Sequence, residues 1–180
     1  MRLHEAPALA TERLLLRGFL DADVDALAEM NADPVVMRYL GGVRSPEWCA
    51  ASIERCRQQW SELGFGRFVV EDKAIGKFAG WVTLDPVELD GYTDDVEIGW
   101  RLVRACWGQG IATESAAAVL DWAFASLPVG RVLAVADTEN ARSISVMRRL
   151  GMVHLADVPD EGRMNTIWCT TRGLRTGAAR

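Results

Sequence analysis

Residues 108–127 join a pair of glycines to an extended helical pattern, and this combination restricts the fold more than any other segment. Gly108 and Gly110 lie one residue apart, and small or apolar residues then recur at helical spacing. Glycines directly before a helix let the backbone approach an anion at the positively polarised N-terminus, because no side chain blocks the way. The segment therefore predicts either an anion site or a tight turn that needs two glycines. The predicted buried face comprises Ile111, Ala112, Ser115, Val119, Ala123 and Leu127.

Two well-known phosphate-binding motifs fit this segment poorly. A P-loop requires GxxxxGK[ST], and no lysine follows these glycines. A dinucleotide fingerprint requires GxGxxG directly after an apolar strand, but Thr113 stands where the third glycine would be. Asp137, at the end of the apolar run 131–137, is the one feature that favours a dinucleotide site.

The rest of the pattern predicts an α+β protein built around one covered sheet. We expect a first strand within 12–19, then a helix capped by Asp21 or Asp23, and a second helix over 45–63 with Ser45 as N-cap and Pro46 at its first position. The remaining elements follow in chain order: strands at 65–72, 74–84, 95–103 and 131–137, a helix from Asn140 to Gly151, and strands at 152–158 and 164–171.

Composition narrows the possible functions. With 180 residues, 49% of them hydrophobic, the chain suits one domain, which we place at 1–172 with a loose tail at 173–180. A formal net charge of -5 argues against a protein that binds mainly nucleic-acid backbone. No segment approaches the roughly 20 apolar residues of a membrane span, so we expect a cytoplasmic protein. Four cysteines without a CxxC pair, and two histidines, predict reduced thiols and no metal site.

Three separated motifs resemble those of one family. They are Glu97–Gly99, Trp107–Glu114 and Asn140–Met152, with a further similar stretch at 32–40. In this order they resemble the GNAT superfamily of acetyl-CoA-dependent N-acetyltransferases, in particular the branch that includes the ribosomal-protein N-terminal acetyltransferases. The resemblance implies a mixed, mostly antiparallel sheet with helices on both faces. It also implies a V-shaped splay between the strands at 95–103 and 131–137.

The resemblance also implies a set of residues that bind acetyl-CoA, the expected cosubstrate. Backbone N–H groups of 108–113 would hold the pyrophosphate, and Arg104 would help to neutralise it unless it is a solvated surface residue. Main-chain groups at Leu102 and Val103 would pair with pantetheine, and Asn140 would bond near the thioester while it caps its helix. The full set is Leu102, Val103, Arg104, Gly108, Gln109, Gly110, Ile111, Ala112, Thr113, Asn140 and Ser143.

Acetyl transfer to an amine requires removal of an amine proton and protonation of the departing thiolate. Glu97 matches the acidic position of the family and is the candidate base; the alternative is a structural ion pair with Arg101. Ser143 is the candidate hydrogen-bond donor to the thiolate; the alternative is an ordinary serine in the first turn of a helix. Met147 stands where many members carry a tyrosine acid, and Ala105 where they carry Gln or Arg. These two departures leave open an acyl-CoA-binding module without turnover.

The acceptor is expected to be a primary amine, either a small molecule or a protein N-terminus. An acidic stretch at 85–97 would attract a cationic amine if it faced the cleft; otherwise it is a solvated loop. Its acidic residues are Asp85, Glu88, Asp90, Asp94, Asp95 and Glu97. We expect no nucleic-acid or membrane partner, and a homodimer is the default among symmetric assemblies.

Overall fold

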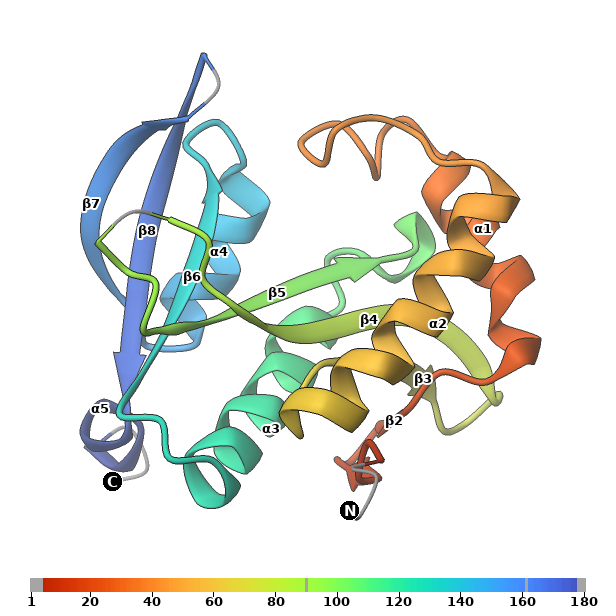
Figure 1. Cartoon of the computed structure of the whole chain (residues 1–180), viewed down its shortest axis with the longest axis horizontal. Coiled ribbons are helices and arrows are strands. Elements are labelled where there is room, and N and C mark those ends of the chain that lie inside the picture. The colour runs from red at the N-terminus through yellow and green to blue at the C-terminus, as the bar shows by residue number, and fades with distance from the viewer. Residues whose placement is uncertain (1–4, 90, 161, 178–180) are drawn as a thin grey trace. The chain divides into compact units, whose positions relative to one another are not determined.

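A computed structural model describes residues 5–89, 91–160 and 162–177 (Figure 1). The protein is α+β, as expected, and its strands hydrogen-bond in the order β1-β2-β3-β4-β5-β6-β8-β7. In chain order the elements are β1 (Leu9–Ala10), β2 (Leu14–Arg17), η1 (Asp21–Asp23), α1 (Val24–Ala32), α2 (Pro46–Leu63), β3 (Arg67–Asp72), β4 (Lys77–Pro86), β5 (Val96–Leu102), η2 (Arg104–Cys106), α3 (Ile111–Ser126), β6 (Arg131–Asp137), α4 (Ala141–Arg149), β7 (Val153–Asp160), β8 (Arg163–Thr171) and α5 (Arg172–Gly177).

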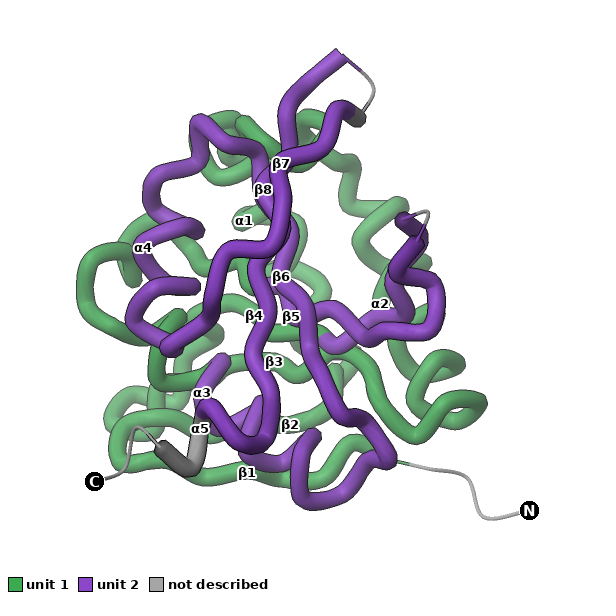
Figure 2. The backbone as a smooth tube through the Cα atoms, turned by 90° about the vertical axis from the view of Figure 1, so that its left-hand side faces the viewer, with its two compact units in different colours: residues 1–83, 100–115 green, residues 84–99, 116–180 purple. Residues whose placement is uncertain are grey.

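The chain forms two compact units, coloured separately in Figure 2. Unit 1 comprises residues 1–83 and 100–115, and unit 2 comprises 84–99 and 116–180. Strand pairing is antiparallel from β1 through β4, and again between β6, β8 and β7. By contrast, β5 and β6 pair in parallel at Val96–Val132 and Glu97–Leu133, the first two or three residues of each strand. A ladder confined to these positions agrees with the expected parting of the two strands.

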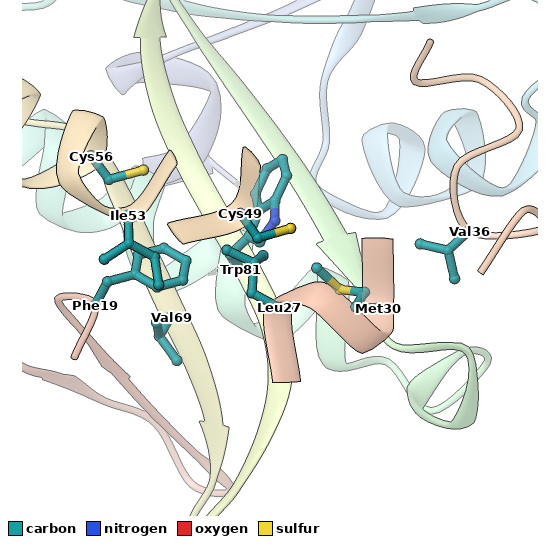
Figure 3. Close-up of a cluster of buried hydrophobic side chains, with 9 residues drawn as sticks. All are labelled: Phe19, Leu27, Met30, Val36, Cys49, Ile53, Cys56, Val69 and Trp81. Atoms are coloured by element: carbon teal, nitrogen blue, oxygen red, sulfur yellow. The ribbon is translucent and has the colours of Figure 1, made fainter. Parts of the chain in front are cut away.

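Helices α1 and α2 pack on β3 and β4 in unit 1. Their apolar positions meet Val69 and Trp81 from the two strands in one buried cluster, which Figure 3 shows. The remaining members of the cluster are Phe19, Leu27, Met30, Val36, Cys49, Ile53 and Cys56. In unit 2, a second cluster joins Val87, Leu133, Ile167 and Cys169. All four cysteines are free thiols, as expected, and three of them are buried.

Local sequence signals account for the ends of two helices. The Ser45 hydroxyl accepts a hydrogen bond from the Trp48 N–H at 3.2 Å, and Gly64 ends α2 with φ +73°. The Asn140 side chain caps α4 by accepting from the Ser143 N–H at 3.2 Å, and Gly151 follows the helix with φ +71°. Ser45, Asn140 and Gly151 match the sequence prediction, and α2 ends at residue 63 as the pattern predicts.

The predicted cap of α1 is confirmed in position but not in its hydrogen bond. Asp23 is at the N-cap position, but its carboxylate makes no bond to an N–H group of α1. It instead accepts from the Leu20 N–H at 2.7 Å and from two nitrogens of Arg17, at 2.8 and 2.9 Å. The half-buried guanidinium of Arg17 holds this carboxylate because a charged, bidentate donor binds a carboxylate more strongly than a single amide does.

Candidate functional site

The two glycines open a turn directly before α3, as the sequence predicts. Gly108 and Gly110 have φ of +75° and +78°, a conformation that glycine adopts without strain. The first bond into the helix runs from the Glu114 N–H to the Gly110 carbonyl at 2.9 Å. The N–H groups of residues 111–113 come before this bond, at the end of the helix where backbone donors lack intrahelical partners.

The surroundings of this turn fit an anion. A Cβ added at Gly108 would meet no atom within 4 Å, so the backbone is open where a side chain would otherwise project. The Thr113 hydroxyl is buried and, among the described residues, has no hydrogen-bond partner. Arg104 and Gln109 are exposed beside it. An open backbone, an unused hydroxyl and a helix N-terminus are what a phosphate group needs.

Arg13 holds this turn, and sequence reasoning missed it. Its guanidinium donates to the Gln109 carbonyl at 3.0 Å and forms an ion pair with Glu114 at 2.6 Å. Burial alone would raise the pKa of Glu114, but hydrogen bonds from Thr11 and Arg13 outweigh it and lower that pKa. Arg13 directly precedes β2 and lies 101 positions before Glu114 in the sequence. No local pattern could therefore have linked the two residues.

The main-chain groups at the end of β5 are partly engaged within unit 1. The Val103 N–H donates to the Ala79 carbonyl at 3.0 Å, and the Leu102 carbonyl accepts from the Trp107 indole N–H, also at 3.0 Å. The Val103 carbonyl accepts from the Cys106 N–H at 2.9 Å. Each carbonyl keeps a second lone pair for a ligand, whereas the Val103 N–H is already used.

Asn140 and Ser143 meet in unit 2 through the cap of α4. The cap occupies the Asn140 amide oxygen, which leaves its NH₂ group as the donor for a ligand. Asp137 supports the turn before them: its carboxylate accepts from the Glu139 N–H at 2.8 Å. Asp137, the one residue that favoured a dinucleotide site, therefore has a local structural role in this turn.

Glu97 is largely buried on β5, also in unit 2. Burial, then the negative charges of Asp85 and Glu88, raise the pKa of Glu97 to about 7. Its sequence-based alternative was an ion pair with Arg101, but Arg101 donates to Asn31 at 2.7 Å. A carboxylate with a pKa near neutrality is suited to accept a proton at physiological pH.

The other sequence candidates differ in their surroundings. Met147 is 1% exposed and belongs to the core of α4, so it offers no donor. Within the acidic stretch, Asp95 forms an ion pair with Arg131, Glu88 and Asp94 are exposed, and Asp90 lies outside the described residues. Over the ranges that the structure describes, no cluster of His, Cys, Asp and Glu could hold a metal, and no helix has the length and apolar character of a membrane span.

Comparison with known proteins identifies the family. Residues 13–153 match the model of the acetyltransferase (GNAT) domain. The uncharacterized protein YkkB of Bacillus subtilis is 32% identical over 145 residues, covering 80% of this chain and 84% of its own. The FsC-acetyl coenzyme A-N(2)-transacetylase of Aspergillus fumigatus is 29% identical over 172 residues, covering 86% of this chain and 68% of its own.

A solved structure agrees with the sequence relatives. The crystal structure of the acetyltransferase from Agrobacterium tumefaciens superposes with a TM-score of 0.80 at 25% identity, covering 92% of this chain and 95% of that one. Family model, relatives and fold all concur, and the glycine turn before α3 lies within the matched region. The chain therefore belongs to the GNAT family and is an N-acetyltransferase.

Proposed function

We propose that the enzyme transfers the acetyl group of acetyl-CoA to a primary amine by direct attack of the amine on the thioester carbon. The observation that carries this proposal is the open glycine turn before α3, with the buried Thr113 hydroxyl unused beside it. The relative named as an acetyl coenzyme A-N(2)-transacetylase supports the same cosubstrate and the same type of product.

The proposed cosubstrate site uses residues from the turn and from β5. Backbone N–H groups of 108–113 and the Thr113 hydroxyl bind the pyrophosphate, with Arg104 supplying positive charge. The Leu102 and Val103 carbonyls and the Asn140 NH₂ group bind the pantetheine arm. Arg13 is a positioning residue, because it holds the Gln109 carbonyl and Glu114 at the two sides of the turn.

Glu97 is the proposed general base. The amine nitrogen forms a bond to the thioester carbon and loses a proton to Glu97, directly or through water, while backbone N–H groups of β5 stabilise the oxyanion. The carbon–sulfur bond then breaks. The thiolate leaves with a hydrogen bond from Ser143 and takes up a proton to give the free thiol of CoA.

We base the proposed class of acceptor on the branch of the family that the motifs resemble. The motifs at 97–99, 107–114 and 140–152 support placement near the ribosomal-protein N-terminal acetyltransferases, with a protein N-terminus or a small amine as acceptor. We further propose one catalytic domain over 1–172, because β4 and β5 contribute residues to both units. A cytoplasmic location and a homodimer remain predictions.

The decisive experiment measures release of thiol from acetyl-CoA with a thiol-reactive dye across a panel of primary amines, beside reactions without amine. The melting temperature is recorded in parallel with and without CoA. We expect a melting shift with CoA and thiol release that depends on the amine. No melting shift would contradict the CoA site, and a shift without release from any amine would contradict the proposed transfer.

A further inference from the structure

Two arginines of unit 1 meet at one buried tryptophan, in a cluster that the proposed chemistry does not use. The guanidinium carbons of Arg67 and Arg101 lie 4.2 and 4.7 Å from the ring centroid of Trp81. Trp81 is only 6% exposed, and Figure 3 shows its ring beside Cys49 and Leu27. The three residues come from β3, β4 and β5, so adjacent strands of the sheet bring them together.

Neither arginine of this cluster has an acidic partner among the residues that the structure describes. Arg101 donates to the Asn31 amide oxygen at 2.7 Å, and Arg67 reaches the Ser52 hydroxyl only at 3.5 Å. Other arginines of the same unit behave differently: Arg13, Arg17 and Arg57 all form ion pairs with carboxylates. Arg67 and Arg101 therefore differ from these three arginines in lying against a buried ring without a carboxylate beside them.

The cluster carries an excess of positive charge in a buried place. Burial, then the charges of Arg67 and Arg44, lower the pKa of Arg101 to about 9, so this guanidinium still carries a proton at pH 7. Arg44 itself donates to the Gly41 carbonyl at 3.0 Å and lies over the Trp48 ring. Buried charges without a partner are costly, and proteins usually satisfy them.

Four polar atoms of the cluster are buried without a hydrogen-bond partner in the described part of the chain. They are the Nε atoms of Arg67 and Arg101, Nε1 of Trp81 and the hydroxyl of Thr83. Thr83 stands directly opposite Arg67 in the β3–β4 ladder, which places the two side chains on one face of the sheet. The three nitrogens can only donate, so the group that satisfies them must accept hydrogen bonds.

An anionic oxygen acceptor satisfies both the charge and the donors. Guanidinium groups bind carboxylate and phosphate in bidentate geometry. Arg101 follows the proposed base Glu97 by four residues, so the strand that carries the base also carries one arginine of this cluster. The proposed pyrophosphate site is the glycine turn before α3, so a second anion comes either from the acceptor or from the 3′-phosphate of CoA, and the position of Arg101 on the strand of the proposed base favours the acceptor.

We infer that Arg67 and Arg101 bind a carboxylate of the acceptor, so that the enzyme acts on amines that also carry an acid group, as an amino acid does. This inference rests on the proposed function for its acceptor, but the anion site itself is testable without turnover.

The first test measures binding of a simple carboxylate. Melting temperatures of the wild type, Arg67→Gln, Arg101→Gln and the control Arg57→Gln are compared in succinate, in succinamide and in sodium chloride of equal ionic strength. Arg57 is the matched control because it already has carboxylate partners. We expect succinate alone to stabilise the wild type and the control, and both cluster variants to lose this effect. Equal melting shifts in all four proteins, or no shift in the wild type, would overturn the inference.

The second test uses pairs of amines that differ by one carboxylate: lysine with cadaverine, and ornithine with putrescine. The ratio of kcat/KM within each pair is compared between proteins, which cancels the intrinsic reactivity of the amines. We expect the ratio to favour the carboxylated amine at least tenfold in the wild type and to fall at least tenfold in Arg101→Gln. The variant Arg101→Lys keeps the positive charge but cannot form a bidentate pair with a carboxylate. Its ratio is expected to lie between those of the wild type and Arg101→Gln.

The outcomes separate this inference from the proposed function. An unchanged ratio in Arg101→Gln with a higher KM for acetyl-CoA would assign the site to a phosphate of CoA and overturn the inference. An unchanged ratio with only a lower melting temperature would make the cluster structural and also overturn it. If no amine reacts and CoA does not bind, the proposed function fails, while the succinate measurement still decides whether the anion site exists.

Discussion

Replacing Glu97 by Gln should make the protein more stable, and the gain should grow with pH. Burial and two acidic neighbours raise the pKa of Glu97 from 4.5 to about 7 in the folded state. Below pH 4.5 the carboxyl is protonated in both the folded and the unfolded protein, and its burial carries no charge penalty. As the pH rises through 7, the folded protein must ionise a buried group, and the penalty levels off above this value. At 1.36 kcal/mol per pKa unit, the full penalty is about 3 kcal/mol.

The assay is urea unfolding of the wild type and Glu97→Gln at closely spaced values between pH 4 and 9. The difference in the free energy of unfolding should rise by about 3 kcal/mol from the acidic to the alkaline end, with most of the change between pH 4.5 and 7. Glu114→Gln is the control of opposite sign, because Thr11 and Arg13 lower the pKa of Glu114. At neutral pH the wild type should have a higher free energy of unfolding than Glu114→Gln, and this difference should become smaller as the pH falls.

A flat difference between the wild type and Glu97→Gln across this range would refute the reasoning. It would mean that Glu97 titrates as an exposed glutamate does, and that the desolvation on which its proposed role as a base depends is absent. A difference that falls with rising pH would be equally damaging, because it would place a cation beside the carboxylate.

Three further outcomes are expected. Glu97→Gln should lower kcat and remove the rise of kcat/KM that the wild type shows with an apparent pKa near 7. Its Kd for acetyl-CoA, measured by calorimetry, should stay unchanged. An unaltered pH–rate profile would eliminate Glu97 as base. Gly108→Val should weaken CoA binding at least tenfold in equilibrium titration. Gly76 also has a positive φ and open space around it, and the control Gly76→Val should bind CoA normally. Equal losses of CoA affinity in the two variants would point to backbone strain in place of a phosphate site. Arg17→Met should lower the free energy of unfolding by about 3 kcal/mol in urea titration, because it leaves the buried carboxylate of Asp23 unpaired; a loss below about 1 kcal/mol would show that this pair is solvated.

Local signals in the sequence predicted the features that depend on neighbouring residues. Ser45 and Gly64 bound α2, and the glycine turn before α3 lies where the sequence places it. These features depend on backbone angles and on hydrogen bonds over three or four residues, which a short motif can encode. The α+β class and the order of the longer strands followed from periodicity in the same way. The two-residue strand β1 was missed because it is too short to show a period.

Features that depend on distant residues could not be predicted from the sequence. The carboxylate of Asp23 binds Arg17 in place of the helix N-terminus, and no motif signals this competition. Arg67, Trp81 and Arg101 meet only because β3, β4 and β5 are adjacent in the sheet. The pKa of Glu97 likewise depends on burial and on Asp85 and Glu88, which the sequence showed only as part of an acidic stretch.

The hydrogen bonds from Thr11 and Arg13 to Glu114 also constrain how the glycine turn is made. They join residues that are 103 and 101 positions apart, so forming them closes a very long loop. The chain loses the conformational entropy of this loop before the hydrogen bonds can form. During synthesis the two N-terminal residues emerge about a hundred residues before their partner. The glycine turn therefore reaches its final shape late in folding, after most of unit 1 has been synthesised.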